Sequence, residues 1–352
     1  MLSELKSAPR LRAFRSRLLS RQRIQDLARV EGLEELVRLL KDSRYAKYVS
    51  SASRLEELSS GITQCFLDDV EHLKRVCGGV AYTLINMLSC VDVVKTIFSI
   101  IRAIYFEGAS GLKRIPSYRL YGEAKTVYDY LAQQAYEDRE RRSVRALVKR
   151  VADSIREPVI REALIQSVAK LESTEDPNVI EVATATLLAQ RLLEAIPRDG
   201  IRLSVPIEKM VVPYIDYLVV QSQANLLLLK RVERALVEIA LKAASPKVAE
   251  AISTSISTGS ALVLYQALAR AHGLPSVKLE SESQADEIVY RGIFRRIRSD
   301  AELAFASYPF TPALGVAAYF LAYIEYRDLM SILALKLTGA EVGDLSTVLI
   351  AA

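Results

Sequence analysis

Apolar residues recur along the chain at the three- and four-residue spacing of an α-helix. One apolar face runs over residues 33–40, directly after Gly32, and a second runs over 58–73. Residues 82–104 are strongly apolar, with a single charged interruption at Asp92 and Lys95. The only strand-like stretch, 201–205, is too short and isolated to build a sheet. The sequence therefore predicts an all-α fold.

Glycine and proline mark the places where these helices are expected to end. Glu157-Pro158 and Asp176-Pro177 each impose a stop, because the residue before a proline is pushed out of the helical conformation. Stronger breakers are Gly78-Gly79, the segment Pro197–Pro206 together with Pro213, and the pair Pro309 and Pro312.

The same order of features repeats in three stretches of the chain. Each stretch has an amphipathic helix, a breaker, an apolar helix with tyrosines, and a polar break before a Leu/Ile-rich helix. The stretches are 62–95, 180–225 and 288–328, and their polar breaks are Asp92 to Lys95, Ser222 to Asn225 and Glu325 to Asp328. Three units too small to bury their own faces must pack on one another, which predicts a ring or funnel.

These repeats suggest a division of the chain into three helical bundles with pseudo-threefold symmetry. The expected boundaries are 1–115, including a basic N-terminal helix, then 116–236 and 237–352. An all-α protein without repeats also shows helices separated by breakers, so that alternative stays open.

The composition limits both the fold class and the kinds of site that the chain can form. Among 352 residues there are 14 Gly and 11 Pro, which suits long regular elements rather than many short strands. The cysteines Cys65, Cys77 and Cys90 form no C-x-x-C pair, and such a sparse set indicates reduced thiols in a cytosolic protein. A zinc site would need His72, Asp68 and a cysteine, and a plain helix surface is the preferred interpretation of the first two.

Motifs for catalysis are not found in the sequence. It contains neither a G-x-S-x-G turn nor a G-x-x-x-x-G-K-[ST] loop, and its two histidines stand near no candidate nucleophile. We therefore expect no enzyme activity, no cofactor and no metal.

Positive charge is concentrated in the first part of the chain. Residues 1–30 contain eight Lys or Arg against two Asp or Glu, whereas the whole chain has a net charge of +5. A nucleic-acid arm, an Arg-rich presequence and the polar face of an amphipathic helix all fit this pattern. Leu11, Phe14 and Leu18 lie at helical spacing, and Ser20 can cap the next helix, which favours the amphipathic helix.

Of two further basic runs, 139–150 contains no aromatic residue that would stack on bases, and 291–298 contains only Phe294. We therefore expect no nucleic acid among the partners.

Membrane spans are not expected either. The stretch 303–324 is cut by Pro309 and Pro312, and the stretch 251–269 is diluted by serines and threonines. The first 30 residues contain no apolar core of a signal peptide.

Several motifs, taken in order, resemble one known family. They are RLRAFRSRLLS at 10–20, LEEL at 33–36, LLKDSRYA at 39–46, and PFTPAL at 309–314 followed by Tyr323, Glu325, Arg327-Asp328-Leu329 and Ile332. The chain is similar over nearly its whole length to the C subunit of archaeal-type ATP synthases, a relative of the d subunit of vacuolar ATPases. It departs from the family pattern at Lys95, where asparagine is usual, and in the helix after Pro177, which lacks a tyrosine-rich face.

The resemblance implies a non-catalytic rotor subunit of the central stalk. Such a subunit is a socket of three helical lobes that sits on the membrane ring of proteolipids and receives the foot of the central axle. It transmits torque during ion-coupled ATP synthesis or hydrolysis, has no cofactor, and is a peripheral protein at the cytoplasmic face of the cell membrane.

Basic residues near the ends of the lobes are the expected contacts to carboxylates of the axle or the ring. They are Arg12, Arg15, Arg17, Lys95, Arg102, Arg231 and Arg234. A solvated helix face is the simpler interpretation of each residue taken alone. A helical-repeat scaffold that binds other protein partners is the alternative function.

Overall fold

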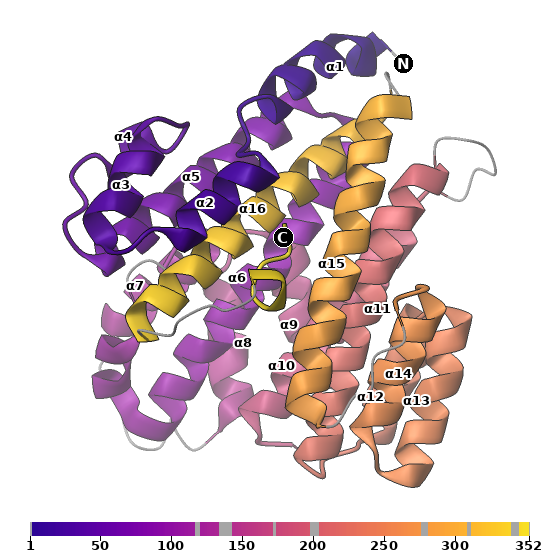
Figure 1. Ribbon diagram of the computed structural model, residues 1–352. Coiled ribbons are helices and arrows are strands. Elements are labelled where there is room, and N and C mark those ends of the chain that lie inside the picture. The colour runs from indigo at the N-terminus through magenta and orange to yellow at the C-terminus, as the bar shows by residue number, and fades with distance from the viewer. Residues whose placement is uncertain are drawn as a thin grey trace. The chain divides into compact units, whose positions relative to one another are not determined.

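The protein is all-α, as the sequence predicts, and Figure 1 shows its helices in a computed structural model. The structure describes residues 2–116, 120–133, 143–171, 174–197, 204–275, 281–307, 311–338 and 345–351. Over these ranges the regular elements are helices, and no strand is present.

The described residues form two compact units. Unit 1 comprises Met1–Asn86, Ile196–Tyr214 and Tyr290–Ala352, and unit 2 comprises Met87–Ala195 and Ile215–Val289. The division falls inside three long helices, which are α6 (Gly79–Glu107), α11 (Ser204–Leu228) and α15 (Glu282–Ser307).

Unit 1 is built around a long C-terminal helix, α16 (Ala313–Thr338). Its other elements are α1 (Leu2–Arg15), α2 (Arg21–Arg29), α3 (Leu33–Lys41), α4 (Ala46–Val49), α5 (Leu55–Val76) and the short 3-10 helix η4 (Leu345–Thr347). Helices α1, α2 and α5 all pack on α16, which is drawn in yellow in Figure 1. Because α16 has neighbours on several sides, it is buried over most of its first 17 residues and is apolar all round.

Aromatic side chains fill part of the contact between α5 and α16. The ring of Phe66 on α5 lies 4.7 Å from Tyr326, 5.9 Å from Tyr323 and 6.2 Å from Tyr319, measured between centroids. Such pairs add to the stability that burial alone provides.

Unit 2 has an apolar core of its own. Its complete elements are the 3-10 helix η1 (Gly108–Arg114), α7 (Gly122–Gln133), α8 (Val144–Ser154), α9 (Pro158–Lys170), α10 (Pro177–Ala195), α12 (Arg234–Ala243), α13 (Pro246–Thr258) and α14 (Ala261–Ala271). Helix α10 packs against α9 and α12, α8 packs against α9, and α13 and α14 form an antiparallel pair. The second half of α6 contributes Ile97, Phe98 and Ile101 to this core.

Several local expectations are confirmed. The Ser20 hydroxyl accepts a hydrogen bond from the Arg23 amide at 3.2 Å and so caps α2. Helices α9 and α10 begin at Pro158 and Pro177, as the two proline stops predict. Helix α5 ends before Gly78.

The three predicted polar breaks are wrong. Residues 92–95 lie inside α6, 222–225 inside α11, and 325–328 inside α16. Polar side chains do not interrupt a helix when, as for Glu325 and Asp328, they find hydrogen-bonding partners in the interior.

Pro213 is also not a break, because α11 continues through it. A proline removes one backbone hydrogen bond, and the buried neighbours Met210, Val211, Tyr214 and Ile215 hold the helix together around the gap. The strand-like stretch 201–205 ends in the first turn of α11, and its residues 201–203 lie outside the described ranges.

The order of long helices is compatible with three repeats. Pairs formed by an amphipathic helix and a following long apolar helix recur as α5 with α6, α10 with α11, and α15 with α16. The threefold division at 115 and 236 stays a prediction.

Candidate functional site

The seven basic residues expected at a partner interface fall into two groups. Arg12, Arg15 and Arg17 belong to unit 1, and Lys95, Arg102, Arg231 and Arg234 belong to unit 2. All are exposed except Lys95 and Arg102, which are half-buried on α6.

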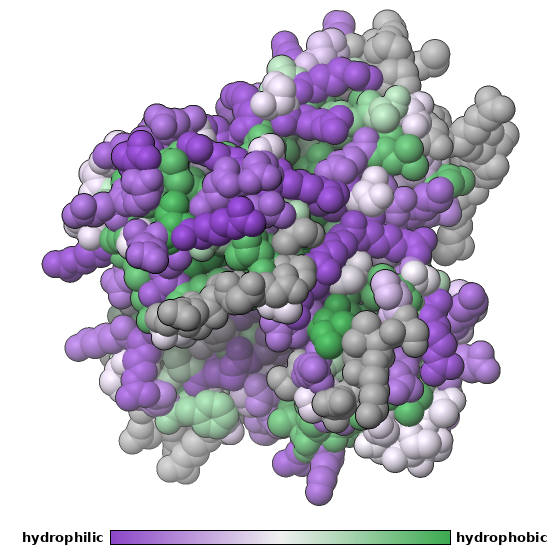
Figure 2. All heavy atoms as spheres, viewed as in Figure 1, coloured by the Kyte–Doolittle hydropathy of each residue, from purple (hydrophilic) through white to green (hydrophobic). Residues whose placement is uncertain are grey.

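The group in unit 1 lies in the last turn of α1 and directly after it. Figure 2 shows hydrophilic residues gathered on the visible face over α1 to α3. The Arg15 guanidinium lies 5.0 Å from the centre of the Phe305 ring, and that of Arg17 lies 5.9 Å from the Phe14 ring. Contacts of this kind hold a cation in place without neutralising it. Within the described part of the chain neither of these arginines, nor Arg12, forms an ion pair, so their charges are available to carboxylates outside the chain.

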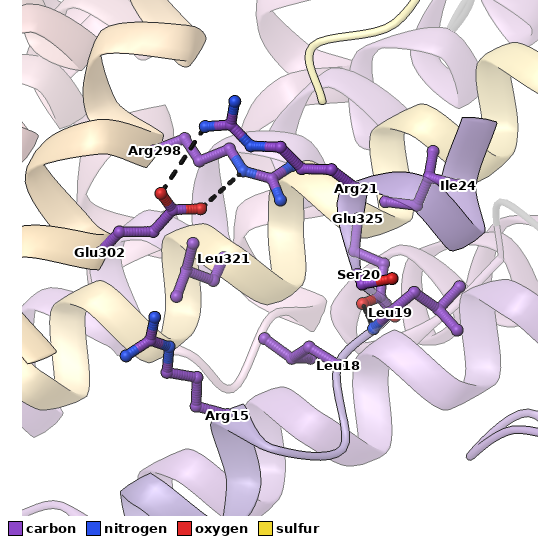
Figure 3. Close-up of a pocket in the computed structure, with 10 residues that line it drawn as sticks. All are labelled: Arg15, Leu18, Leu19, Ser20, Arg21, Ile24, Arg298, Glu302, Leu321 and Glu325. Atoms are coloured by element: carbon purple, nitrogen blue, oxygen red, sulfur yellow. Dashed lines mark hydrogen bonds and ion pairs between the residues drawn. The ribbon is translucent and has the colours of Figure 1, made fainter. Parts of the chain in front are cut away.

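Arg15 also lines a pocket of about 360 Å³ in unit 1 (Figure 3). The lining side chains come from α1, the turn after it, α2, α15 and α16. They are Arg15, Leu18, Leu19, Ser20, Arg21, Ile24, Arg298, Glu302, Leu321 and Glu325.

One wall of the pocket carries two cations that share one carboxylate. Arg298 Nε donates to Glu302 Oε1 at 3.0 Å, and Arg21 Nη2 lies 3.6 Å from Glu302 Oε2. The Arg298 side chain is 9% exposed, whereas Arg21 and Glu302 reach solvent. Because Glu302 neutralises only one of these guanidiniums and Arg15 is unpaired among the described residues, this side of the pocket is positively charged.

The opposite wall is a buried polar cluster centred on Glu325 of α16. Its carboxylate accepts hydrogen bonds from the Leu19 amide at 2.5 Å, from Arg44 Nη2 at 2.7 Å and from the Tyr45 hydroxyl at 2.7 Å. Arg44 also donates to Asp69 of α5. A single buried network therefore ties the turn after α1 and the start of α4 to both α5 and α16.

The charges of this network are set by burial and by one another. Burial raises the pKa of Asp69, and the nearby Arg44 guanidinium works against that shift. Burial opposes the charge of Arg44 itself, but the Glu325 carboxylate raises its pKa. Burial and then Glu325 raise the pKa of Tyr45, which keeps this hydroxyl protonated as a donor.

The group in unit 2 is partly used inside the chain. Arg102 donates to Glu181 of α10, and its Nη1 lies 3.4 Å from Asn178 Oδ1. Burial raises the pKa of Glu181, and Arg102 and then Lys95 lower it, so both cations face this carboxylate. Arg234 pairs with Glu238 at 3.1 Å on the exposed face of α12.

Arg231 is exposed and forms no ion pair among the described residues. Four of the seven basic residues, Arg12, Arg15, Arg17 and Arg231, therefore keep their charges free of carboxylates in the described part of the chain.

Sequence reasoning missed the role of the acidic residues in α16. Asp328 is fully buried and accepts hydrogen bonds from the amides of Ile350 at 2.6 Å and Ala351 at 2.9 Å. Burial raises its pKa to about 6, against the effect of these two amides. The sequence does show these charged residues within an otherwise apolar helical stretch. In the structure they hold other segments of the chain against α16 and do not break the helix.

Among the described residues no three or more His, Cys, Asp or Glu side chains gather where they could hold a metal ion. The His72 ring stacks on Phe14 with centroids 6.1 Å apart. His272 Nε2 lies 2.8 Å from Asp216 Oδ2, and the Ser245 hydroxyl donates to the same oxygen at 2.6 Å. In the structure His72 therefore takes part in ring stacking, and His272 lies in a polar contact with Asp216.

The described residues contain one helical stretch, Gly79–Arg114, whose length and apolar composition would suffice to cross a membrane. In its most apolar window 67% of the residues are buried inside the fold, as in the core helix of a globular unit.

Comparison with known proteins relates the chain to one family. Residues 8–342 match the family model described as ATP synthase (C/AC39) subunit. Among curated proteins no significant match is found.

Proposed function

We infer the function from one premise, namely that the chain belongs to the family of ATP synthase (C/AC39) subunits. Its partners therefore lie within an ATP synthase complex, which is associated with a membrane. The observation that carries the proposal is the length of the match, which covers residues 8–342 of 352.

The specific function proposed is that of a non-catalytic rotor subunit in the central stalk of an archaeal- or vacuolar-type rotary ATP synthase. The chain would link the foot of the axle to the membrane ring of proteolipids and transmit torque between them. It would be a peripheral protein at the cytoplasmic face of the cell membrane, held there by the ring, with three helical lobes arranged as a funnel.

Transmission of torque requires elements that resist bending and shear. Helices α6, α11, α15 and α16 are each at least 25 residues long, and α16 is braced in unit 1 by the buried bonds of Glu325 and Asp328. A buried charge whose hydrogen bonds are satisfied strongly penalises any displacement that would unpair it. These features support a stiff adaptor.

The proposed contacts to partner carboxylates are the seven basic residues. Arg12, Arg15 and Arg17 are the strongest candidates, because they pair with no carboxylate in the described part of the chain. Arg231 is likewise unpaired there and lies in the turn after α11. Arg102 and Arg234 would have to exchange Glu181 and Glu238 for a partner, and Lys95 lies close to the first of these acids.

Affinity purification tests the proposal directly. A tagged copy of the chain, expressed in its native cells and extracted in mild detergent, is expected to bring down the axle subunits and the proteolipid ring. Recovery of other proteins without any ATP synthase subunit would contradict the proposal and favour a helical scaffold of another kind.

A further inference from the structure

We propose that the turn between α11 and α12, residues Leu228–Val232, binds the anionic headgroup surface of a lipid membrane. We call these residues the tip. The inference rests on the proposed function, because only a subunit held at the membrane brings the tip to lipid.

The first observation is the exposure of apolar side chains in the tip. Leu228, Leu229 and Val232 are 58%, 42% and 39% exposed, all within five residues. The other large apolar side chains exposed in the described part of the chain occur singly along the sequence, at Tyr82, Phe106, Ile165, Val205, Leu303 and Leu337. Isolated exposed apolar residues are ordinary, whereas a cluster indicates a contact surface.

The second observation is the backbone conformation of Lys230. Its φ is 53°, and it is the only residue other than glycine with a positive φ in the described ranges. The amides of Lys230 and Arg231 donate to the carbonyls of Leu227 at 3.0 Å and Leu226 at 2.9 Å, which is the bonding pattern of a helix that ends in a Schellman motif. Glycine is the usual residue at this position, so a lysine here carries some backbone strain.

The third observation is the charge of the tip. Lys230 and Arg231 are both exposed, and neither forms an ion pair among the described residues. Arg234 follows and is paired with Glu238, while Glu233 is half-buried at the start of α12. Two unneutralised cations therefore lie directly between exposed apolar side chains.

Two cationic side chains flanked by exposed apolar ones in a turn match the chemistry of an anionic bilayer. Lipid phosphates attract the cations, and the acyl boundary below them takes up the leucines and the valine. Because the family belongs to a membrane-associated complex, we favour a lipid surface over an acidic protein as the partner that binds the tip.

The test measures flotation of the purified full-length chain with lipid vesicles. The chain is expected to bind vesicles of phosphatidylcholine with phosphatidylglycerol more tightly than vesicles of phosphatidylcholine alone, and to lose binding as salt rises. Each cation near such a surface raises the affinity for the membrane about fivefold. The double variant Lys230→Glu with Arg231→Glu is therefore expected to bind the anionic vesicles at least about 25-fold more weakly. Leu228→Ser with Val232→Ser is expected to weaken it about tenfold.

Matched controls make the same changes elsewhere. Lys242→Glu with Lys247→Glu changes the charge equally at exposed positions of unit 2, and Ile165→Ser with Leu337→Ser removes exposed apolar side chains outside the tip. Both controls are expected to bind within about twofold of the original chain.

Lys230→Gly separates a binding role from a structural one. Glycine relieves the strain at positive φ, so the melting temperature is expected not to fall, while binding to anionic vesicles falls about fivefold. Equal binding to both kinds of vesicle, or tip variants that bind like their controls, would overturn the proposal. Loss of assembly in detergent by the tip variants, with no vesicle binding by the original chain, would assign the tip to a protein partner instead.

These outcomes are separate from the test of the proposed function. Affinity purification asks whether the chain joins an ATP synthase complex, and the vesicle assay needs no other subunit.

Discussion

At the scale of single residues, a few buried charged groups carry much of the organisation of unit 1. Glu325 and Asp69 share the guanidinium of Arg44, and the same Glu325 carboxylate holds the turn after α1 through the Leu19 amide. Asp328 holds the segment Leu345–Ala351 against α16 through backbone amides. Each group has given up its hydration, so each depends on hydrogen-bonding partners inside the fold.

Removal of the central cation tests this dependence. Arg44→Met leaves Glu325 and Asp69 as buried carboxylates without their counter-charge and is expected to lower the free energy of unfolding by about 3–5 kcal/mol. Chemical denaturation measures the change. Arg38→Met breaks an exposed pair with Glu35 on α3 and serves as the control, with no measurable effect expected. Equal effects of the two substitutions would contradict a central role of Arg44.

Asp328 predicts a pH dependence with a definite sign. Its pKa rises from 3.8 to about 6 on folding, so its contribution to stability is fully present below pH 3.8 and is lost as the pH rises through about 6. Compared with Asp328→Asn, which does not titrate, the original chain should gain about 2 kcal/mol of unfolding free energy between pH 7 and pH 4. Urea titrations at several pH values measure this difference. Parallel stability curves for the two chains would show that Asp328 has an ordinary pKa.

At the scale of elements, the close packing of α16 depends on one small residue near its start. An ideal Cβ built on Gly315 lies 2.6 Å from Cys77 Sγ and 3.1 Å from Ala81 Cβ. Such distances leave no room for a side chain unless a neighbouring helix moves. The glycine therefore allows α16 to approach the junction of α5 and α6.

Gly315→Ala is expected to lower the free energy of unfolding by about 1–3 kcal/mol, because the added methyl group overpacks this contact. Thermal or chemical unfolding measures the loss. Gly78→Ala adds the same group where no heavy atom lies within 4 Å and is the matched control. Cys77→Ala in the Gly315→Ala background removes the nearest atom and should recover part of the loss; no recovery would place the strain elsewhere.

At the scale of the whole molecule, charge is distributed unevenly between parts of the chain. The first 30 residues hold eight of the 47 basic residues against two of the 42 acidic ones, and three of those eight lie at the end of α1 without ion-pair partners in the described part of the chain. A local excess of cations attracts acidic surfaces and makes association dependent on salt. The N-terminal part of unit 1 is thus the region where electrostatics should act most on assembly.

Joint charge reversal of Arg12, Arg15 and Arg17 to Glu should weaken association with the proposed partners, the axle or the ring, by at least about tenfold, because each desolvated pair is worth about 1 kcal/mol or more. The affinity of the purified chain for these partners at two salt concentrations measures the effect. The fold should be kept, since all three side chains are exposed and lose only the surface ring contacts of Arg15 and Arg17. A variant with Arg29, Lys41 and Arg75 changed to Glu carries the same net charge and controls for nonspecific repulsion. Equal affinities of the two triple variants would contradict an interface at the end of α1.

The sequence by itself determined the all-α class through its helical period, and it determined the cap at Ser20 and the helix starts at Pro158 and Pro177 through single residues. These features depend on residues only a few positions apart. The order of motifs was enough to indicate the family that the comparison shows. Sequence patterns misjudged the polar positions inside α6, α11 and α16. In α16 the polar residues break no helix because distant parts of the chain supply their partners. Only the tertiary structure decided that Glu325 meets Arg44 from 281 positions away and that Asp328 meets amides 22 and 23 positions later. Burial and pairing across such separations depend on how the helices pack, and the spacing of residues along a single helix does not encode that packing.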